Sequence, residues 1–233
     1  MAEETPQITL YWLNASRSQR IAWLLDELKV SYKTVNYSRD KKTFMAPAEA
    51  KEFHPLGKFP VIKDGDRVVA ESGLIVEYLI EKYGKGTELE AKNEDESLDV
   101  RYFTHYAEGT LQPIALVMQL LNMVQVTTVV PLLVRPIARF VASKIASGYP
   151  GQDLTLQLGV LEERLKKNGT GFLVGDHLSG ADIMMSFPLQ LAQFGQAVPK
   201  DKYPEITAYV ERLASRDAYQ VADAKTGHMG FKL

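Results

Sequence analysis

The first third of this chain alternates strand and helix signals, and this alternation restricts the fold more than any other feature of the sequence. Apolar runs of strand length are separated by a segment in which Ile21, Leu24 and Leu28 recur at helical spacing. The turn Asp64-Gly65-Asp66 then predicts a tight hairpin. The expected elements are strands at 8–13, 32–37, 61–63 and 67–70 and helices at 21–28, 46–53 and 72–83.

This order of elements predicts a small mixed sheet. A helix between the first two strands implies a right-handed crossover and a parallel pair, whereas the hairpin adds an antiparallel pair. The order βαβαββα is that of a thioredoxin-like domain, which we place at residues 1–84. The helix at 72–83 is apolar on more than one side, so it should lie between the sheet and a second layer.

Beyond this domain the sequence predicts helices. Residues 85–97 are polar and acidic and are typical of a linker, and residues 98–233 should form an all-α domain. Ser179 and Asp182 have the S-x-x-D spacing of a capping box at a helix start, which gives both a structural role. Helices are expected at 98–125, 131–147, 154–167, 182–194 and 204–215.

The composition excludes several kinds of function. The 233 residues carry a net charge of −2, which supplies no broad basic field for nucleic acid. The chain has no cysteine, so disulfides, thiolate metal sites and catalytic protein thiols are excluded, and no metal is expected. Residues 109–134 carry no charge, but interspersed polar residues favour a buried helix over a membrane span. The acidic N-terminus resembles no targeting signal, so a cytoplasmic protein is expected.

Two features of the first domain could bind a small peptide. Pro60 opens a strand, which is compatible with a cis bond, and the backbone of Phe59 could then pair with an extended peptide. Glu71 and Ser72 stand at a helix start, where backbone N–H groups favour a carboxylate and Glu71 could receive an ammonium group. The alternatives are an edge strand that begins at a proline and an ordinary helix cap.

A third feature is the polar turn Asn14-Ala15-Ser16 between the first strand and the first helix. It lies at the carboxyl edge of the sheet, where α/β folds bind ligands. The Ser16 hydroxyl could donate a hydrogen bond to an anion there, or it could only cap the helix.

These motifs, in this order, resemble the cytosolic glutathione transferases. The resemblance rests on His-Pro-Leu-Gly-Lys-Phe-Pro-Val at 54–61, Ala-Glu-Ser-Gly at 70–73 and Leu-Ser-Gly-Ala-Asp-Ile at 178–183. Segments 14–20 and 105–113 are most similar to the fungal, yeast-type branch and its bacterial relatives. The resemblance covers essentially the whole chain and implies glutathione as co-substrate and a homodimer, for which Phe44 is a candidate anchor into the partner.

The resemblance also implies roles for single residues. Ser16 matches the serine that hydrogen-bonds the glutathione sulfur, with Asn14 as its rival. The remaining glutathione contacts fall on Lys58 for the glycyl carboxylate, Phe59 and Pro60 for the cysteinyl unit, and Glu71 and Ser72 for the γ-glutamyl end.

The expected activity is attack of the activated thiol on a hydrophobic electrophile or a hydroperoxide, as in detoxification. Tyr102, His105 and Tyr106 fall at i, i+3 and i+4 of one helix and could line the electrophile pocket, or pack in the core. The alternatives are a protein that acts mainly as a glutathione-dependent peroxidase and a non-catalytic, transferase-like binding module. A cycle through a protein mixed disulfide is impossible without cysteine.

Overall fold

The N-terminal domain of the computed structural model contains the predicted mixed sheet. The structure describes residues 7–41, 43–126, 131–195 and 197–226. The strands follow the order β2-β1-β3-β4, in which β1 pairs parallel with β2 and antiparallel with β3, and β3 pairs antiparallel with β4. The thioredoxin-like arrangement is therefore confirmed. The strands are β1 (Ile8–Leu13), β2 (Tyr32–Tyr37), β3 (Val61–Asp64) and β4 (Arg67–Ala70).

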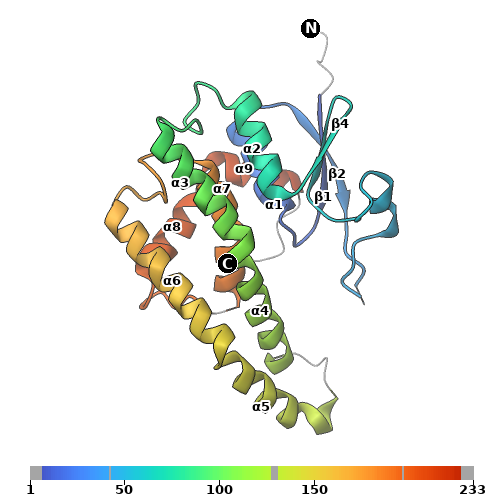
Figure 1. The fold of residues 1–233 in the computed structure, drawn as a ribbon. Coiled ribbons are helices and arrows are strands. Elements are labelled where there is room, and N and C mark those ends of the chain that lie inside the picture. The colour runs from blue at the N-terminus through green and yellow to red at the C-terminus, as the bar shows by residue number, and fades with distance from the viewer. Residues whose placement is uncertain (1–6, 42, 127–130, 196, 227–233) are drawn as a thin grey trace.

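Helices cover both faces of this sheet (Figure 1). Alternate β1 residues, Ile8, Leu10 and Trp12, belong to the same core as α1 (Ser18–Glu27) and α2 (Ser72–Tyr83). On the other face, the ring of Tyr11 stacks on Phe53 with centroids 4.0 Å apart, just after the 3-10 helix η1 (Ala48–Glu52). The helix expected at 46–53 is thus only this short 3-10 segment, because its chain is too short and polar to present an apolar stripe.

The second domain is helical, as predicted, although its elements differ in detail. The helix expected from Leu98 begins at Glu94, inside the segment interpreted as a linker, where the Asn93 side chain caps it. A π-helical turn, η2, interrupts this helix, and α9 was not predicted. The elements are α3 (Glu94–Tyr106), η2 (Ala107–Leu111), α4 (Gln112–Val126), η3 (Leu132–Val134), α5 (Arg135–Ala146), α6 (Tyr149–Asn168), α7 (Gly180–Phe194), α8 (Pro204–Ala214) and α9 (Asp217–Thr226).

Helix α7 joins the two domains. The predicted capping box is confirmed at its start, where the Asp182 carboxylate accepts hydrogen bonds from the Ser179 N–H and O–H, each at 2.8 Å. A Cβ at Gly180 would lie 3.1 Å from Ile80 of α2, so glycine permits a close approach of α7 to α2. Helix α2 therefore lies between the sheet and α7, as its two apolar sides predicted.

Two features lie at the margins of the helical domain. Helix α9 packs on α1, and the Tyr219 ring meets Trp23 edge to face at 5.3 Å.

Helices α4 and α5 form a hairpin that extends away from the sheet (Figure 1). Part of the uncharged stretch 109–134 is helix α4, and residues 127–130 lie outside the described ranges. Within those ranges, no helix combines the length and the apolar character needed to cross a bilayer.

Candidate active site at the open edge of the sheet

The strand register brings the predicted site residues to one edge of the sheet. Leu13 at the end of β1 pairs with Tyr37 at the end of β2, and Val61 at the start of β3 pairs with Ala70 at the end of β4. The segments that follow or precede these residues therefore emerge side by side. We call this the open edge, made of residues 14–17, 37–39, 59–60 and 71–72.

The β1–α1 loop, residues 14–17, holds Ser16 in an internal hydrogen-bond network. The Ser16 hydroxyl lies 2.7 Å from the Leu13 carbonyl and 2.9 Å from Ser18 Oγ, two acceptors for its one proton, and it accepts from the Ser18 N–H at 3.1 Å. Ser16 is also buried. Its oxygen therefore shapes the turn into α1, and its proton must leave an acceptor within the protein before it can serve a ligand.

Asn14 is held differently in the same loop. Its Oδ1 accepts from the Arg39 N–H at 2.8 Å, which fixes the amide plane. No described residue accepts a hydrogen bond from its Nδ2. The Arg39 guanidinium also reaches the Asn14 carbonyl at 3.3 Å and the Phe44 carbonyl at 2.9 Å. Asn14 therefore combines a fixed orientation with an unused donor.

The bond between Phe59 and Pro60, in the turn before β3, is cis, an isomer with which the sequence was compatible. Phe59 is buried against Tyr37 and Phe53, with ring centroids 5.4 and 5.6 Å away. Within the described part of the chain, nothing bonds to the backbone N–H or carbonyl of Phe59. Packing fixes this side chain while its backbone stays available to pair with an extended ligand.

Glu71 precedes α2 in an unusual backbone conformation, with φ 71° and ψ 121°. A positive φ is unfavourable for a residue with a Cβ, and such residues are concentrated at binding sites. Glu71 is exposed, and among the described side chains none contacts its carboxylate. Ser72 is buried at the first turn of α2, and Lys58 is exposed beside the cis turn.

The open edge is about as long as a tripeptide. Neighbouring strands lie about 4.8 Å apart, so the distance from β1 across β3 to β4 is about 10 Å. Three extended residues span roughly 10–11 Å. A tripeptide could thus reach from the β1–α1 loop to Glu71 while passing the Phe59 backbone.

An ion-pair cluster connects the β1–α1 loop to the helical domain. Glu108 of η2 contacts Arg17 at 2.5 Å and forms a closer ion pair with Arg20 of α1. Arg20 is fully buried, and it also donates to the Met184 carbonyl of α7 at 2.8 Å. Glu108 therefore holds the loop and the first helix against the second domain.

The charges in this cluster shift one another's ionisation. Burial would raise the pKa of Glu108, but attraction to Arg20 and Arg17 outweighs burial and lowers that pKa below its ordinary value. Burial lowers the pKa of Arg39, and the nearby charge of Arg17 lowers it further. Two guanidinium groups therefore lie beside the β1–α1 loop and favour an anion there.

The structure does not bring the predicted electrophile residues to this loop. The Tyr106 hydroxyl donates to Gln157 of α6, and burial raises the pKa of Tyr106. Tyr102 is exposed, with its ring 5.9 Å from that of Tyr106, and His105 is exposed. Their role in an electrophile pocket stays a prediction. Glu108 is the residue of this segment that contacts the β1–α1 loop.

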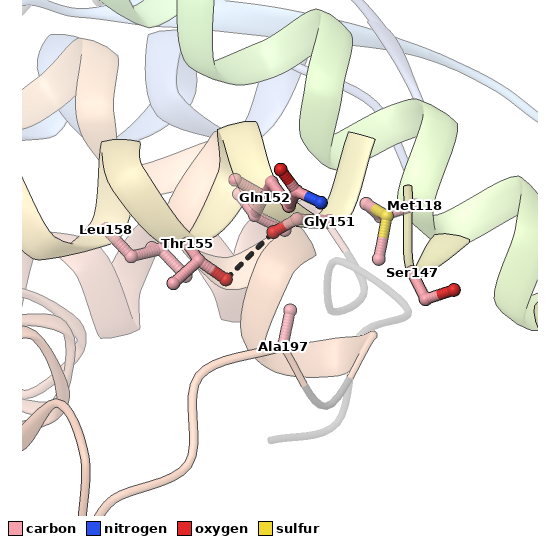
Figure 2. A pocket seen from close by; sticks show the side chains of 8 residues that line it. Met118, Ser147, Gly151, Gln152, Thr155, Leu158 and Ala197 are labelled. Carbon is pink, nitrogen blue, oxygen red and sulfur yellow. Dashed lines mark hydrogen bonds between the residues drawn. The ribbon is translucent and has the colours of Figure 1, made fainter. Parts of the chain in front are cut away.

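A cavity of about 520 Å³ lies elsewhere, between α4 and α6. Figure 2 shows its lining, where Met118 of α4 faces α6 and Thr155 donates to the Gly151 carbonyl at 2.8 Å. Met118 lies ten residues after Glu108, about 15 Å along the helix. None of the predicted site residues lines this cavity, so it is separate from the open edge.

Comparison with known proteins identifies the family. Residues 10–88 match the family described as Glutathione S-transferase, N-terminal domain, and residues 149–217 match Glutathione S-transferase, C-terminal domain. Glutathione S-transferase 1 of Saccharomyces cerevisiae is 35% identical over 231 residues, which are 97% of each chain. The chain belongs to the glutathione S-transferase family.

Solved glutathione S-transferases share the fold of this transferase. One from Actinobacillus pleuropneumoniae is 32% identical, with a TM-score of 0.71 over 96% of this chain and 95% of that chain. The glutathione transferase URE2P8 from Phanerochaete chrysosporium, solved with oxidized glutathione, has a TM-score of 0.74 at 20% identity, over 96% and 97% of the two chains. Members of this family use glutathione as co-substrate.

Sequence reasoning missed part of this transferase's site. Arg39 orients Asn14, and Glu108 holds Arg17, yet neither Arg39 nor Glu108 was a candidate. Glu108 was visible within the motif 105–113, but its partner lay in the other domain. Across the described residues, no group of three or more His, Asp or Glu side chains is placed to hold a metal ion.

Proposed function

We propose that this transferase binds glutathione along the open edge and presents its thiolate at the β1–α1 loop. The unpaired backbone of Phe59 supports this proposal most strongly, because a buried, fixed residue with a free N–H and carbonyl suits an added peptide strand. The start of α2 favours the γ-glutamyl carboxylate, and the Glu71 carboxylate favours its ammonium group. Lys58 would meet the glycyl carboxylate.

The donor to the thiolate is the Asn14 amide in this proposal, with Ser16 fixing the loop. A thiol of pKa about 8.5 is only a few per cent ionised at neutral pH, and lowering its pKa by two units takes roughly 2.7 kcal/mol. One hydrogen bond to a charged group supplies about 1.5–3 kcal/mol. Asn14 Nδ2 has no partner among the described residues, whereas the Ser16 hydroxyl already has two acceptors within the protein, the Leu13 carbonyl and Ser18 Oγ.

Absorbance titration of the bound thiol tests this assignment. Asn14→Ala should raise the pKa of bound glutathione by roughly one to two units, because it removes a charge-assisted hydrogen bond. Turnover should fall most near neutral pH and recover at high pH, where the thiol ionises unaided. Ser16→Ala is the paired variant. A pKa that shifts in Ser16→Ala and not in Asn14→Ala would return the role to the serine.

The thiolate would attack an electrophilic carbon or the oxygen of a hydroperoxide, as in cytoplasmic detoxification. Conjugation and peroxidase assays on the same preparation measure the balance between these two reactions. Glutathione retention without either turnover would favour the non-catalytic binding module. The unused donor of Asn14 argues against that reading, because a module that only binds proteins has no need of it.

We also propose that the transferase is a homodimer. Phe44 and Met45 are 61% and 67% exposed, and Leu74 of α2 and Leu98 and Tyr102 of α3 are exposed as well. Arg39 fixes the Phe44 carbonyl, so the aromatic ring projects from a held loop. Light scattering should give twice 26.1 kDa for the wild type. Phe44→Ser should shift this mass toward the monomer, and a monomeric wild type would contradict the proposal.

A further inference from the structure

The α4–α5 hairpin carries an apolar surface that the described fold leaves uncovered. Leu133, Leu132, Ile137 and Phe140 are 93%, 73%, 66% and 63% exposed. Single exposed apolar residues are ordinary, but a continuous group marks an interaction surface. We call this group the α5 patch, and it consists of Leu132, Leu133, Ile137, Phe140, Val141 and Ile145, all exposed.

Two members of the α5 patch, Ile137 and Phe140, lie on the side of α5 that faces away from the protein. Helix α5 packs on α4 and α6, and Ala142 is buried on the side that packs. With 3.6 residues per turn, Ile137 and Phe140 lie about 140–160° around the helix axis from Ala142. The outer side of α5 therefore carries exposed apolar side chains together with Lys144. Exposed apolar groups that lie together in this way mark an interaction surface.

The charges around the patch all have one sign. Between residues 109 and 152 the sequence contains Arg135, Arg139 and Lys144 and no acidic residue, although the whole chain has a net charge of −2. The Lys144 ammonium lies 5.8 Å from the centre of the Phe140 ring, so cationic and apolar groups share one surface. Arg139 is held beside it by a hydrogen bond to the Gln125 carbonyl.

These features favour an anionic lipid surface over a second copy of the chain. A two-fold contact of this patch with the same patch of a second copy would bring only positive charges together, because residues 109–152 contain no acidic residue. A bilayer with anionic headgroups offers apolar depth for Ile137 and Phe140 and negative charge for the cations. We propose that the α5 patch docks on the surface of an anionic lipid bilayer, with α5 lying in the headgroup plane.

The position of α5 suits this arrangement. Figure 1 shows α5 at the end of the molecule far from the sheet, so docking through α5 would leave the sheet uncovered. Tyr149 at the start of α6 is exposed next to the patch, and tyrosine side chains are enriched at the level of lipid headgroups. The proposal concerns location on a surface and does not depend on the thiol chemistry.

Sedimentation with vesicles tests the proposal. We expect the full chain to sediment with vesicles of phosphatidylcholine and phosphatidylserine and to stay in solution with phosphatidylcholine alone. Raising the salt from about 0.1 M to about 1 M shortens the screening length from about 10 Å to about 3 Å and should release the protein. Equal binding to both vesicle types, or none to either, would overturn the proposal.

Two pairs of matched variants separate the apolar and ionic contributions. Ile137→Ser/Phe140→Ser should weaken binding roughly tenfold or more, whereas Leu156→Ser/Val160→Ser, at exposed positions of α6, should leave it unchanged. Arg139→Gln/Lys144→Gln should also weaken binding roughly tenfold or more, because each cation near an anionic surface contributes roughly fivefold. The control for this variant is Lys166→Gln/Lys167→Gln, which removes the same amount of charge from the C-terminal end of α6.

A fluorescent variant gives a readout that does not depend on a loss of binding. Trp12 and Trp23 are buried and also emit, so the emission of the wild type is subtracted and the difference reports on a tryptophan at the exposed position 140. The emission of Phe140→Trp should shift to the blue with anionic vesicles and stay unchanged with neutral ones. A blue shift without vesicles that grows with protein concentration, or a smaller oligomer in Ile137→Ser/Phe140→Ser, would show a second copy on the patch. Either result would overturn the proposal.

Discussion

The two edges of the sheet, at opposite ends of its strands, differ in which polar groups the protein pairs with its own side chains. At the far end of β3, Asp64 Oδ2 accepts from Lys82 at 2.6 Å and from Tyr78 and Tyr83 at 2.8 Å each, whereas the buried Oδ1 of the same carboxylate has no partner among the described residues. We call this the closed edge. At the open edge, by contrast, Phe59 keeps an unpaired backbone and Asn14 an unused donor within the described residues. The same strands thus support stability at one end and leave ligand-binding capacity at the other.

Glu108→Gln should cause the largest loss of stability, because Glu108 holds the loop of the open edge against the helical domain. The variant leaves the buried Arg20 guanidinium without its counter-charge, which costs about 3–5 kcal/mol when one partner of a buried pair is removed. Urea unfolding measures the loss. Glu211→Gln is the control, since its pair with Lys200 is exposed and contributes less than about 1 kcal/mol. Equal losses in the two variants would contradict the role given to Glu108.

The difference in stability between the wild type and Glu108→Gln should also depend on pH. The folded-state pKa of Glu108 is lowered, so its contribution to stability is complete above the unfolded value of about 4.3. That contribution is lost as the pH falls through the lower folded value. The stability difference between wild type and Glu108→Gln should therefore be constant near neutral pH and shrink below about pH 4. A difference that grows with acid would contradict the ion pair.

Asp64→Asn should have an intermediate effect, confined to the closed edge. Burial would raise the pKa of Asp64, but hydrogen bonds from Lys82, Tyr78 and Tyr83 lower it overall, so the variant removes a charged acceptor. We expect a loss of about 2 kcal/mol in the free energy of unfolding. Glutathione affinity, measured by calorimetry, should stay within about threefold of the wild type. A larger loss of affinity would show that the two edges are coupled.

Glu71→Gly should have the smallest effect on stability, and its sign should be opposite. Glycine tolerates the positive φ at this position, so relief of strain offsets its greater flexibility when unfolded, with a net gain of roughly 0.5–1 kcal/mol. Glutathione affinity should fall roughly tenfold, because the ammonium group loses its partner. Lys29→Gly, at an exposed residue with φ 55°, is the control and should gain stability without losing affinity.

Local motifs were the part of this structure that the sequence predicted well. The capping box at Ser179 and Asp182 depends on two residues three apart. The mixed sheet followed from the hairpin at Asp64 and the crossover before it. In each case the physical cause lies within a few residues, so spacing alone carries the information.

Contacts between distant segments could not be predicted in this way. Glu108 and Arg20 are 88 positions apart, and their pairing depends on how α7 brings the two domains together. The π-helical turn that carries Glu108 has no spacing signature. Helix α9 buries little more than Tyr219, Ala222 and Thr226, so its sequence shows no clear apolar stripe. At the open edge, the hydrogen bond from the Arg39 N–H to Asn14 Oδ1 shows that Nδ2 is the unused group of Asn14, and the sequence did not reveal this contact.

The packing of α9 on α1 has a consequence for synthesis on the ribosome. The last described residue, Thr226, donates to the Gln19 side chain at 2.8 Å, and Arg216 pairs with Glu27 at 2.6 Å. The surface of the first domain is therefore completed only by the end of the chain. At about 5–20 residues per second, the roughly 140 residues after α2 take about 7–28 s to be translated. Throughout that interval Trp23 and its neighbours on α1 lack their final cover and are available to chaperones.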